Sequence, residues 1–154
     1  MPGLDGDFYI VGLCEGNHCS ESQKFDAGNG EMVMMKKSVS ESNCIWETVK
    51  KISIPKSAYF RDYSDIEVSP SGRVAITSQE DSRIFVGQLL GISNGVLDPD
   101  AIAFDEEKFK LYDFPKSDGC MTVYCNIEGI TFINDEMIMA VSDKMKKRGK
   151  QPYW

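Results

Sequence analysis

The chain repeats one short pattern, and this repetition constrains its fold more than any other feature. Asp65–Gln79 and Glu128–Asp143 each contain an acidic residue, an apolar strand, a polar turn, a second apolar strand, and then Ser with a polar or acidic residue. With one gap opposite Gly129, Asp65 meets Glu128, Ile66 meets Ile130, Val68 meets Phe132, Val74 meets Ile138, and Ser78-Gln79 meets Ser142-Asp143. Repetition at a fixed period indicates an array of similar structural units.

A third, partial copy opens the chain. Phe8–Gly12 matches the second strand of the pattern, and Cys14-Glu15 falls near the position of Glu80-Asp81. The copies lie roughly 65 residues apart, longer than the 40–50 typical of repeats built from small sheets. The loops at Cys19–Gly30 and Gly91–Asp105 account for the excess, and we expect the second loop to reach over a neighbouring unit.

Strand signals dominate the chain, while amphipathic helical periodicity is nearly absent. Short apolar or alternating runs lie between clusters of Gly, Pro, Asn, Asp and Ser, such as the turn Ser69-Pro70-Ser71-Gly72. We expect strands near Phe8–Leu13, Glu31–Lys37, Ile45–Ile54, Ser64–Val68, Val74–Ser78, Ile84–Leu89, Phe109–Phe114, Met121–Cys125, Gly129–Phe132 and Met137–Val141.

A two-strand unit repeated with outer strands between its copies predicts an all-β fold, a partial β-propeller of about two to three four-stranded antiparallel blades. A β-sandwich or an irregular meander is the alternative. We divide the single domain 1–154 into a partial blade (1–60), a blade (61–118) and the start of the next (119–154). Because a propeller needs at least four blades, we expect further blades in a longer protein or self-association.

Charge and hydropathy exclude several classes of partner. The net charge of −7 argues against sequence-independent binding to nucleic acid or to an anionic membrane. We interpret the basic run Lys144–Lys150 as a solvated loop, with a phosphate-binding patch as the alternative. No apolar run is long enough for a membrane span. No signal peptide is visible, and the compartment stays open: secretory or extracellular if a full-length protein carries a signal peptide, cytoplasmic otherwise.

The five cysteines are an odd number, which leaves at least one unpaired within the chain. Cys120 and Cys125 flank a predicted strand, and five residues of strand span about 17 Å, too far for a disulfide. Free thiols or bridges to other parts of a larger fold are the favoured interpretation there. A metal site at Cys14, His18 and Cys19 is a less favoured alternative to ordinary thiols.

The segment Asn126–Phe132, followed by Met137–Val141 and Ser142-Asp143, resembles a blade motif of known propellers. It is similar to the Glu-Gly element of the phytase-like and esterase-like propellers, including the SdiA-regulated and gluconolactonase-type (SMP-30-like) groups. In gluconolactonase-type enzymes the Glu of this element helps to bind a divalent metal, and Glu128 is its counterpart by position. The aromatic form of the motif is absent, and the other copy has Asp65 in place of Glu-Gly, so catalysis does not follow.

A second resemblance covers most of the chain and concerns an uncharacterised plant-type group of propeller proteins. It rests on Gly12–Asn17, Tyr59–Ser64 and Thr77–Ser82. This resemblance implies a fold and no activity.

Acidic residues at predicted strand ends are the candidate site residues. The candidate ligand-binding residues are Glu15, Asp62, Asp65, Glu80, Asp81 and Asn126, and the candidate metal ligands, for Ca²⁺, are Glu128 and Asp143. The favoured alternative is that such residues accept backbone N–H groups at turns. For Ser78–Ser82 we favour a solvated turn over a hydrogen-bonded loop, and for Arg61–Tyr63 an ion pair that braces a loop.

Two classes of function compete. The first is a non-enzymatic platform that binds a protein or a small ligand, since no catalytic triad can be assembled around the single histidine, His18. The second is a Ca²⁺-dependent hydrolase of the phytase-like or lactonase/esterase-like kind. Its basis is Glu128-Gly129 together with acidic residues whose mutual repulsion a cation would relieve.

Overall fold

A computed structural model describes residues 1–14, 27–40, 43–115 and 127–142, and it confirms the all-β prediction. The strands are β1 (Tyr9–Leu13), β2 (Glu31–Ser40), β3 (Asn43–Ser53), β4 (Asp65–Val68), β5 (Arg73–Ser78), β6 (Arg83–Leu90), β7 (Ile92–Ser93), β8 (Val96–Leu97), β9 (Ala103–Asp113), β10 (Ile127–Asn134) and β11 (Met137–Ser142). One 3₁₀ turn, η1 (Lys56–Ala58), precedes β4. The predicted strand at Met121–Cys125 lies outside the described residues.

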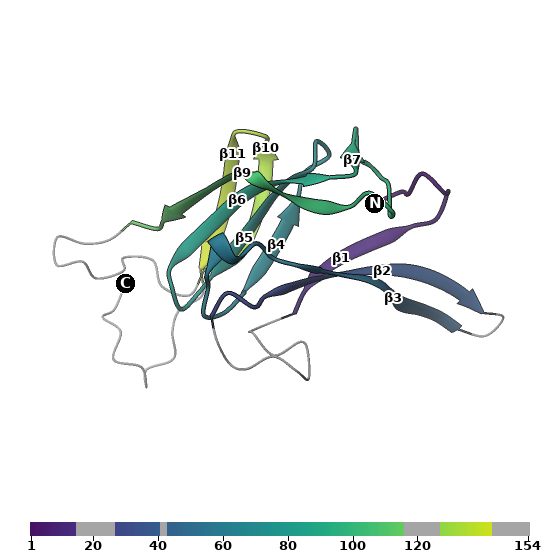
Figure 1. Ribbon diagram of the computed structural model, residues 1–154, viewed down its shortest axis with the longest axis horizontal. Helices are drawn as coiled ribbons and strands as arrows, with labels where there is room; N and C mark the ends of the chain where they lie inside the picture. The colour runs from purple at the N-terminus through teal and green to yellow at the C-terminus, as the bar shows by residue number, and fades with distance from the viewer. Residues whose placement is uncertain (15–26, 41–42, 116–126, 143–154) are drawn as a thin grey trace.

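The strands form three main antiparallel sheets and one small hairpin, β7–β8 (Figure 1). The first sheet has the order β1-β2-β3, the second β4-β5-β6-β9, and the third β10-β11. The second sheet is a complete four-stranded blade, and its first strand, β4, contacts both β1 and β10. Successive sheets therefore stack through their first strands, as propeller blades do, and the fold is a partial β-propeller.

Strand pairing follows the sequence repeat. Ile66 pairs with Ile76 in the hairpin β4–β5, and Ile130 pairs with Ala140 at the equivalent place in β10–β11. The register of β10–β11 shifts beside Gly129, where the alignment of the two copies needs its gap. An extra residue in one strand of a pair is a β-bulge, so the sequence gap corresponds to a backbone feature.

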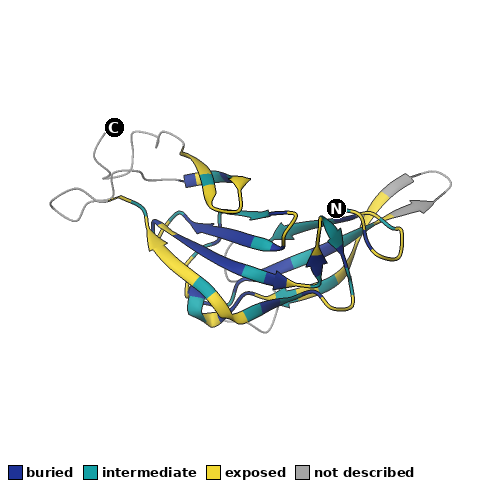
Figure 2. Ribbon diagram, turned by 90° about the horizontal axis from the view of Figure 1, so that it is seen from above, coloured by how far each residue is buried: buried dark blue, intermediate teal, exposed yellow. Residues whose placement is uncertain are grey.

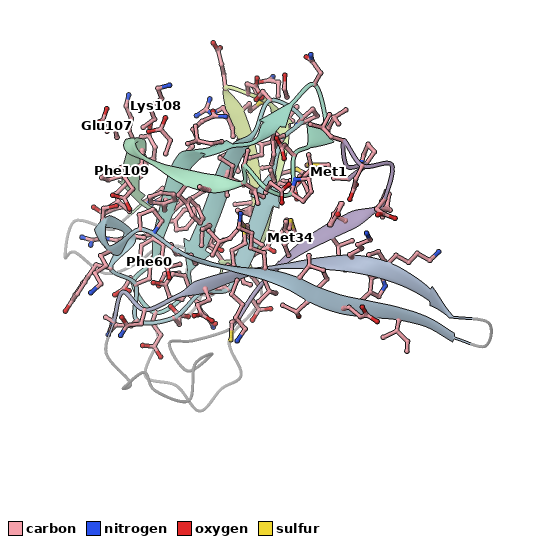
Figure 3. All side chains as sticks on the ribbon, turned by 45° about the vertical axis from the view of Figure 1, so that its right-hand side comes forward. Met1, Met34, Phe60, Glu107, Lys108 and Phe109 are labelled. Carbon is pink, nitrogen blue, oxygen red and sulfur yellow. The ribbon has the colours of Figure 1, made fainter. Side chains whose placement is uncertain are left out.

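Both faces of β5 are covered, which explains its nearly unbroken apolar run. Val74 and Ile76 pack toward the first sheet, whereas Ala75 packs toward the third. Successive side chains of a strand point to opposite faces, so a strand buried on both sides needs apolar residues at nearly every position. Met34 and Phe60, on segments preceding the second sheet, lie in the larger of the two cores (Figure 3).

The predicted turn between β4 and β5 is confirmed. Gly72 has φ +84° and its N–H donates to the Ser69 carbonyl at 2.9 Å. A side chain at Gly72 would meet the Leu89 carbonyl oxygen at 2.8 Å. Glycine is needed at this position because the backbone is left-handed and a neighbouring strand lies too close for a Cβ.

The loop predicted at Gly91–Asp105 contains ordered structure. Its β7–β8 hairpin reaches the N-terminal segment, where Leu97 accepts from the Leu4 N–H at 2.8 Å and donates to the Pro2 carbonyl at 2.9 Å. Strand β9 begins at Ala103, well before the predicted start. The missed part of β9 is charged because it lies on the outer edge strand, where one face and one edge meet solvent (Figure 2).

Cys14 is disulfide-bonded, which excludes it as a thiolate ligand of the less favoured metal site. The other residues of that candidate site, His18 and Cys19, lie outside the described residues.

Within the described part of the chain, no helix is long and apolar enough to cross a membrane.

Candidate functional site

The structure gathers three of the candidate ligand-binding residues at one end of the second sheet. Asp62 lies on the segment that leads into β4, while Glu80 and Asp81 lie in the turn from β5 to β6. Ser78 ends β5 with its side chain fully buried, and it stands between these two segments. We call Arg61, Asp62, Ser78, Glu80 and Asp81 the polar cluster.

Ser78 is the centre of the polar cluster. Its hydroxyl donates to Asp62 Oδ1 and accepts from the Asp81 N–H at 3.0 Å. The same Oδ1 of Asp62 accepts from the Glu80 N–H at 3.0 Å. The segment Ser78–Ser82 is thus a hydrogen-bonded loop, and the favoured prediction of a solvated turn is wrong. The reason is distant in sequence, because Asp62 supplies the acceptor for the Ser78 hydroxyl and the Glu80 N–H of this partly buried turn.

Arg61 and Asp81 form the ion pair of the cluster. Arg61 Nε lies 2.7 Å from Asp81 Oδ1, and the Arg61 N–H donates to Asp81 Oδ2 at 2.8 Å. Arg61 Nη2 also donates to the Glu80 carbonyl at 2.6 Å. The two segments are joined at this point, in agreement with the interpretation of Arg61–Tyr63 as a braced loop.

The pKa of Asp81 reflects two opposed effects. Burial disfavours the carboxylate, but the Arg61 backbone N–H and guanidinium and the Ser78 hydroxyl outweigh it and lower the pKa of Asp81 below its ordinary value. The same contacts raise the pKa of the Arg61 guanidinium. Arg61 itself is largely exposed, so solvent screens part of this attraction.

Replacing Asp81 with asparagine is expected to lower the free energy of unfolding at neutral pH by about 1–2 kcal/mol. The folded protein lowers the pKa of Asp81, so the contribution of Asp81 is complete above its unfolded pKa and is lost as pH falls through the folded pKa. The variant should therefore lose stability less steeply than the wild type below about pH 4.

Urea titrations at several pH values measure this effect. Arg61→Gln should weaken the same acid dependence in part, because it removes the guanidinium but keeps the backbone N–H and the Ser78 hydroxyl, which also lower the pKa of Asp81. An Asp81→Asn protein with the wild-type dependence on acid would contradict the assignment.

Asp65 does not join the polar cluster; it links two blades. Its Oδ1 accepts from its own neighbour, the Ile66 N–H, at 2.9 Å. Its Oδ2 accepts from the Ile130 N–H of β10 at 2.7 Å. A weaker contact runs beside it, from the Thr131 hydroxyl to Glu67 at 3.4 Å. Asp65 thus binds backbone donors of two adjacent inner strands.

Of the remaining candidate residues, Glu15, Asn126 and Asp143 lie outside the described residues. Glu128 is exposed on β10. Among the described residues, no group of three or more His, Cys, Asp or Glu side chains could hold a metal ion. Ca²⁺ ligation by Glu128 and Asp143 stays a prediction.

Two adjoining hollows lie over the part of the second sheet that, among the described residues, the third sheet does not cover. The larger has a volume of 390 Å³ and the smaller 260 Å³, and both are lined by Arg73, Val86 and Tyr112. The larger is closed by the edge strand β9, where Glu107 and Lys108 project from the outer edge of the molecule (Figure 3). The smaller is closed by β11, through Ile138 and Ala140. We call the two hollows together the outer groove.

Sequence reasoning missed the outer groove because its residues come from four strands. Only the structure shows the feature that marks it: Tyr112 is aromatic but half-exposed, whereas its strand partner Ile84 is buried. A large exposed aromatic beside an apolar surface is typical of a contact surface.

Comparison with known proteins finds no matching family model, no matching curated protein and no matching solved structure. The resemblances to phytase-like and plant-type propellers therefore stay predictions. The functional argument rests on the arrangement of this chain's own residues.

Proposed function

We propose that this protein is a binding platform that accepts an extended segment of a partner protein in the outer groove. The observation that carries this proposal is the position of the groove beside β11, which among the described residues pairs only with β10. The outer edge of β11 offers backbone donors and acceptors to an added strand.

The floor of the outer groove supports the same mode of binding. Ile84 and Val86 of β6 form an apolar floor, and Phe114 and Ile138 pack against them. A strand paired with β11 would direct alternate side chains onto this floor, and the side chains between them toward solvent. Affinity in this mode comes from main-chain hydrogen bonds, and specificity comes from the surface under alternate side chains.

The rim of the outer groove carries charges of both signs. The positive charges come from Arg73, Lys108 and Lys110, and the negative ones from Glu107, Asp135 and Glu136. Such a rim favours a partner segment with alternating apolar and polar residues over a uniformly charged one. The Ca²⁺-dependent hydrolase rests on Glu128 and Asp143 and stays an untested alternative.

Random peptides displayed on phage, selected on the whole protein, test this proposal. We expect the selected peptides to alternate between apolar and polar residues. They should bind a Tyr112→Glu variant at least roughly tenfold more weakly, because the new charge projects into both hollows. Fluorescence polarisation with the synthetic peptides measures the change.

Leu4→Glu is the matched control for that experiment. Leu4 is an exposed apolar side chain, and it lies outside the outer groove. Circular dichroism should show both variants folded, and the control should bind the peptides as the wild type does. Selected peptides that bind Tyr112→Glu and the wild type equally, or a selection that enriches no peptide, would refute the proposal.

A further inference from the structure

One edge of the first sheet is only partly paired among the described residues. Strand β1 bonds to β2 through alternate residues. At one end the Lys37 N–H donates to the Phe8 carbonyl at 3.2 Å, and at the other the Cys14 N–H donates to a β2 carbonyl at 3.0 Å. In an antiparallel pair, the residues between such positions direct their backbone groups toward the opposite edge. In β1 these residues are Tyr9, Val11 and Leu13.

The N-terminal segment occupies the first part of that opposite edge. The Tyr9 N–H donates to the Met1 carbonyl at 2.9 Å, and the Met1 amino group donates to the Tyr9 carbonyl at 2.7 Å. The Val11 and Leu13 N–H groups have no such partner among the described residues. The edge of β1 thus already accepts a short antiparallel strand at Tyr9, and the rest of it is open to one.

A hollow of 250 Å³ lies along this edge, between β1 and the inner strand of the second sheet, β4. The two strands lie side by side (Figure 1). Ile10 and Val11 line the hollow from β1, and Ile66 and Val68 line it from β4. Val11, Ile66 and Val68 are half-buried and pack against the larger core. We call this hollow the inner groove.

The complete second sheet shows which residue an added strand needs in the inner groove. By the sequence repeat, β1 corresponds to β5 and Val11 to Thr77. The packing agrees with this alignment, because Tyr9 faces the second sheet as Ala75 faces the third. Thr77 pairs with Asp65 of β4. A residue opposite Val11 in an added strand therefore takes the place that Asp65 has in the second sheet.

Asp65 uses this place to bond to the next inner strand, where its Oδ2 accepts from the Ile130 N–H at 2.7 Å. The repeat aligns Ile130 with Ile66. A carboxylate opposite Val11 would therefore lie beside the Ile66 N–H, which bonds to Oδ1 of its own neighbour Asp65 at 2.9 Å. One N–H group can be shared between two acceptors. The position opposite Val11 thus favours Asp or Glu.

We propose that the inner groove binds an extended protein segment that pairs antiparallel with the open edge of β1 and carries Asp or Glu opposite Val11. Alternate side chains of a strand share one face, so the residue opposite Leu13 also faces the second sheet. An apolar residue is favoured there, because Leu13 packs against the larger core. The segment supplies an inner strand for the first sheet and continues the contact that β4 already makes with β10. Main-chain hydrogen bonds provide affinity, and the acidic residue fixes the register.

A short synthetic peptide with Val-Thr-Asp-Thr at its centre, acetylated and amidated at its ends, tests this proposal on the whole protein. We expect fluorescence polarisation to show binding. Replacing the Asp of the peptide with Ala should weaken binding at least roughly tenfold, because the charged acceptor is lost. Amide exchange should slow at Val11 and Leu13 when the peptide binds.

Val11→Pro tests the same edge from the side of the protein. Proline removes an N–H that does not bond to β2, and it is tolerated where the N–H of an edge strand faces outward. Binding of the peptide should fall at least roughly tenfold, because the open edge loses a donor and gains a ring. Val49→Pro is the matched control: Val49 is the unpaired residue of the bulge in β3, at the outer edge of the same sheet. It should bind the peptide as the wild type does.

Circular dichroism and melting curves should show both proline variants folded. If Val11→Pro does not fold, the Asp-to-Ala peptide and the exchange of Val11 and Leu13 still decide the question. A peptide that does not bind, that binds equally well without its Asp, or that slows the β11 amides instead would overturn the proposal. The inner groove does not share residues with the outer groove. Tyr112→Glu should therefore bind this peptide normally, so the two proposals fail separately.

Discussion

Replacing Phe85 with alanine is expected to lower the free energy of unfolding by about 3–5 kcal/mol, the largest loss we expect from one side chain. Phe85 of β6 is fully buried in the core between the first and second sheets. Its ring stacks on Phe109 at 5.6 Å and meets Phe104 edge-on at 6.2 Å. Alanine would remove both aromatic contacts and leave a cavity that sheet-bound neighbours cannot fill.

Thermal and urea unfolding measure this loss. A chain of this size should melt about 10 °C lower for such a change. Phe85→Leu should fall between alanine and the wild type, which keeps the experiment informative if the alanine variant does not fold. Leu90→Ala is the matched control on the same strand: Leu90 is 48% exposed, and its loss should stay below about 0.5 kcal/mol. Equal losses at Phe85 and Leu90 would contradict the assigned core.

The ring of Phe85 also explains Gly87, its neighbour on the same face of β6. A Cβ at Gly87 would lie 2.7 Å from Phe85 Cε1. The glycine leaves space for the ring rather than providing a special backbone conformation. This reason could not be read from the sequence, where a glycine within a strand indicates a bulge or a close approach without naming the neighbour.

Much of the fold could be predicted from local pattern. Strands such as β5 and β11 were predicted because apolar runs end at polar turns, and the two copies of the hairpin could be aligned before any pairing was known. The strand β9 was predicted only from Phe109 onward, since its first half is charged and lies at the sheet edge. Edge strands lose the alternation on which such predictions depend.

The candidate site was less predictable, because it depends on contacts between distant segments. The sequence alone identifies Asp62 and Asp81 as candidate residues. It could not show that the Ser78 hydroxyl hydrogen-bonds to both carboxylates. The outer groove draws Arg73, Val86 and Tyr112 from three strands and has no local motif. Residue type indicates which side chains can bind a ligand or form hydrogen bonds, whereas the sheet register determines which of those side chains come into contact.

Asp65 shows what the repeat contributes to stability. The alignment places Asp65 and Glu128 at the same position, at the start of the inner strand of successive hairpins. Asp65 uses this position to accept an N–H from the next inner strand, β10. In the third sheet the bulge beside Gly129 leaves Glu128 on the surface. We therefore interpret the acidic residue of the repeat as a link between blades, an interpretation that stands beside metal ligation for Glu128.

Replacing Asp65 with alanine is expected to lower the free energy of unfolding by about 2–3 kcal/mol, because the Ile130 N–H loses a charged acceptor at a partly buried position. Hydrogen exchange should locate the loss, with faster exchange of the β10 and β11 amides. Asp65→Asn keeps a carbonyl oxygen and should lose roughly half as much. Glu67→Ala, on the same strand, removes only the 3.4 Å contact with Thr131 and should leave those amides protected. If Asp65→Ala left their exchange unchanged, or Glu67→Ala accelerated it equally, Asp65 would not be the residue that holds the third sheet to the second.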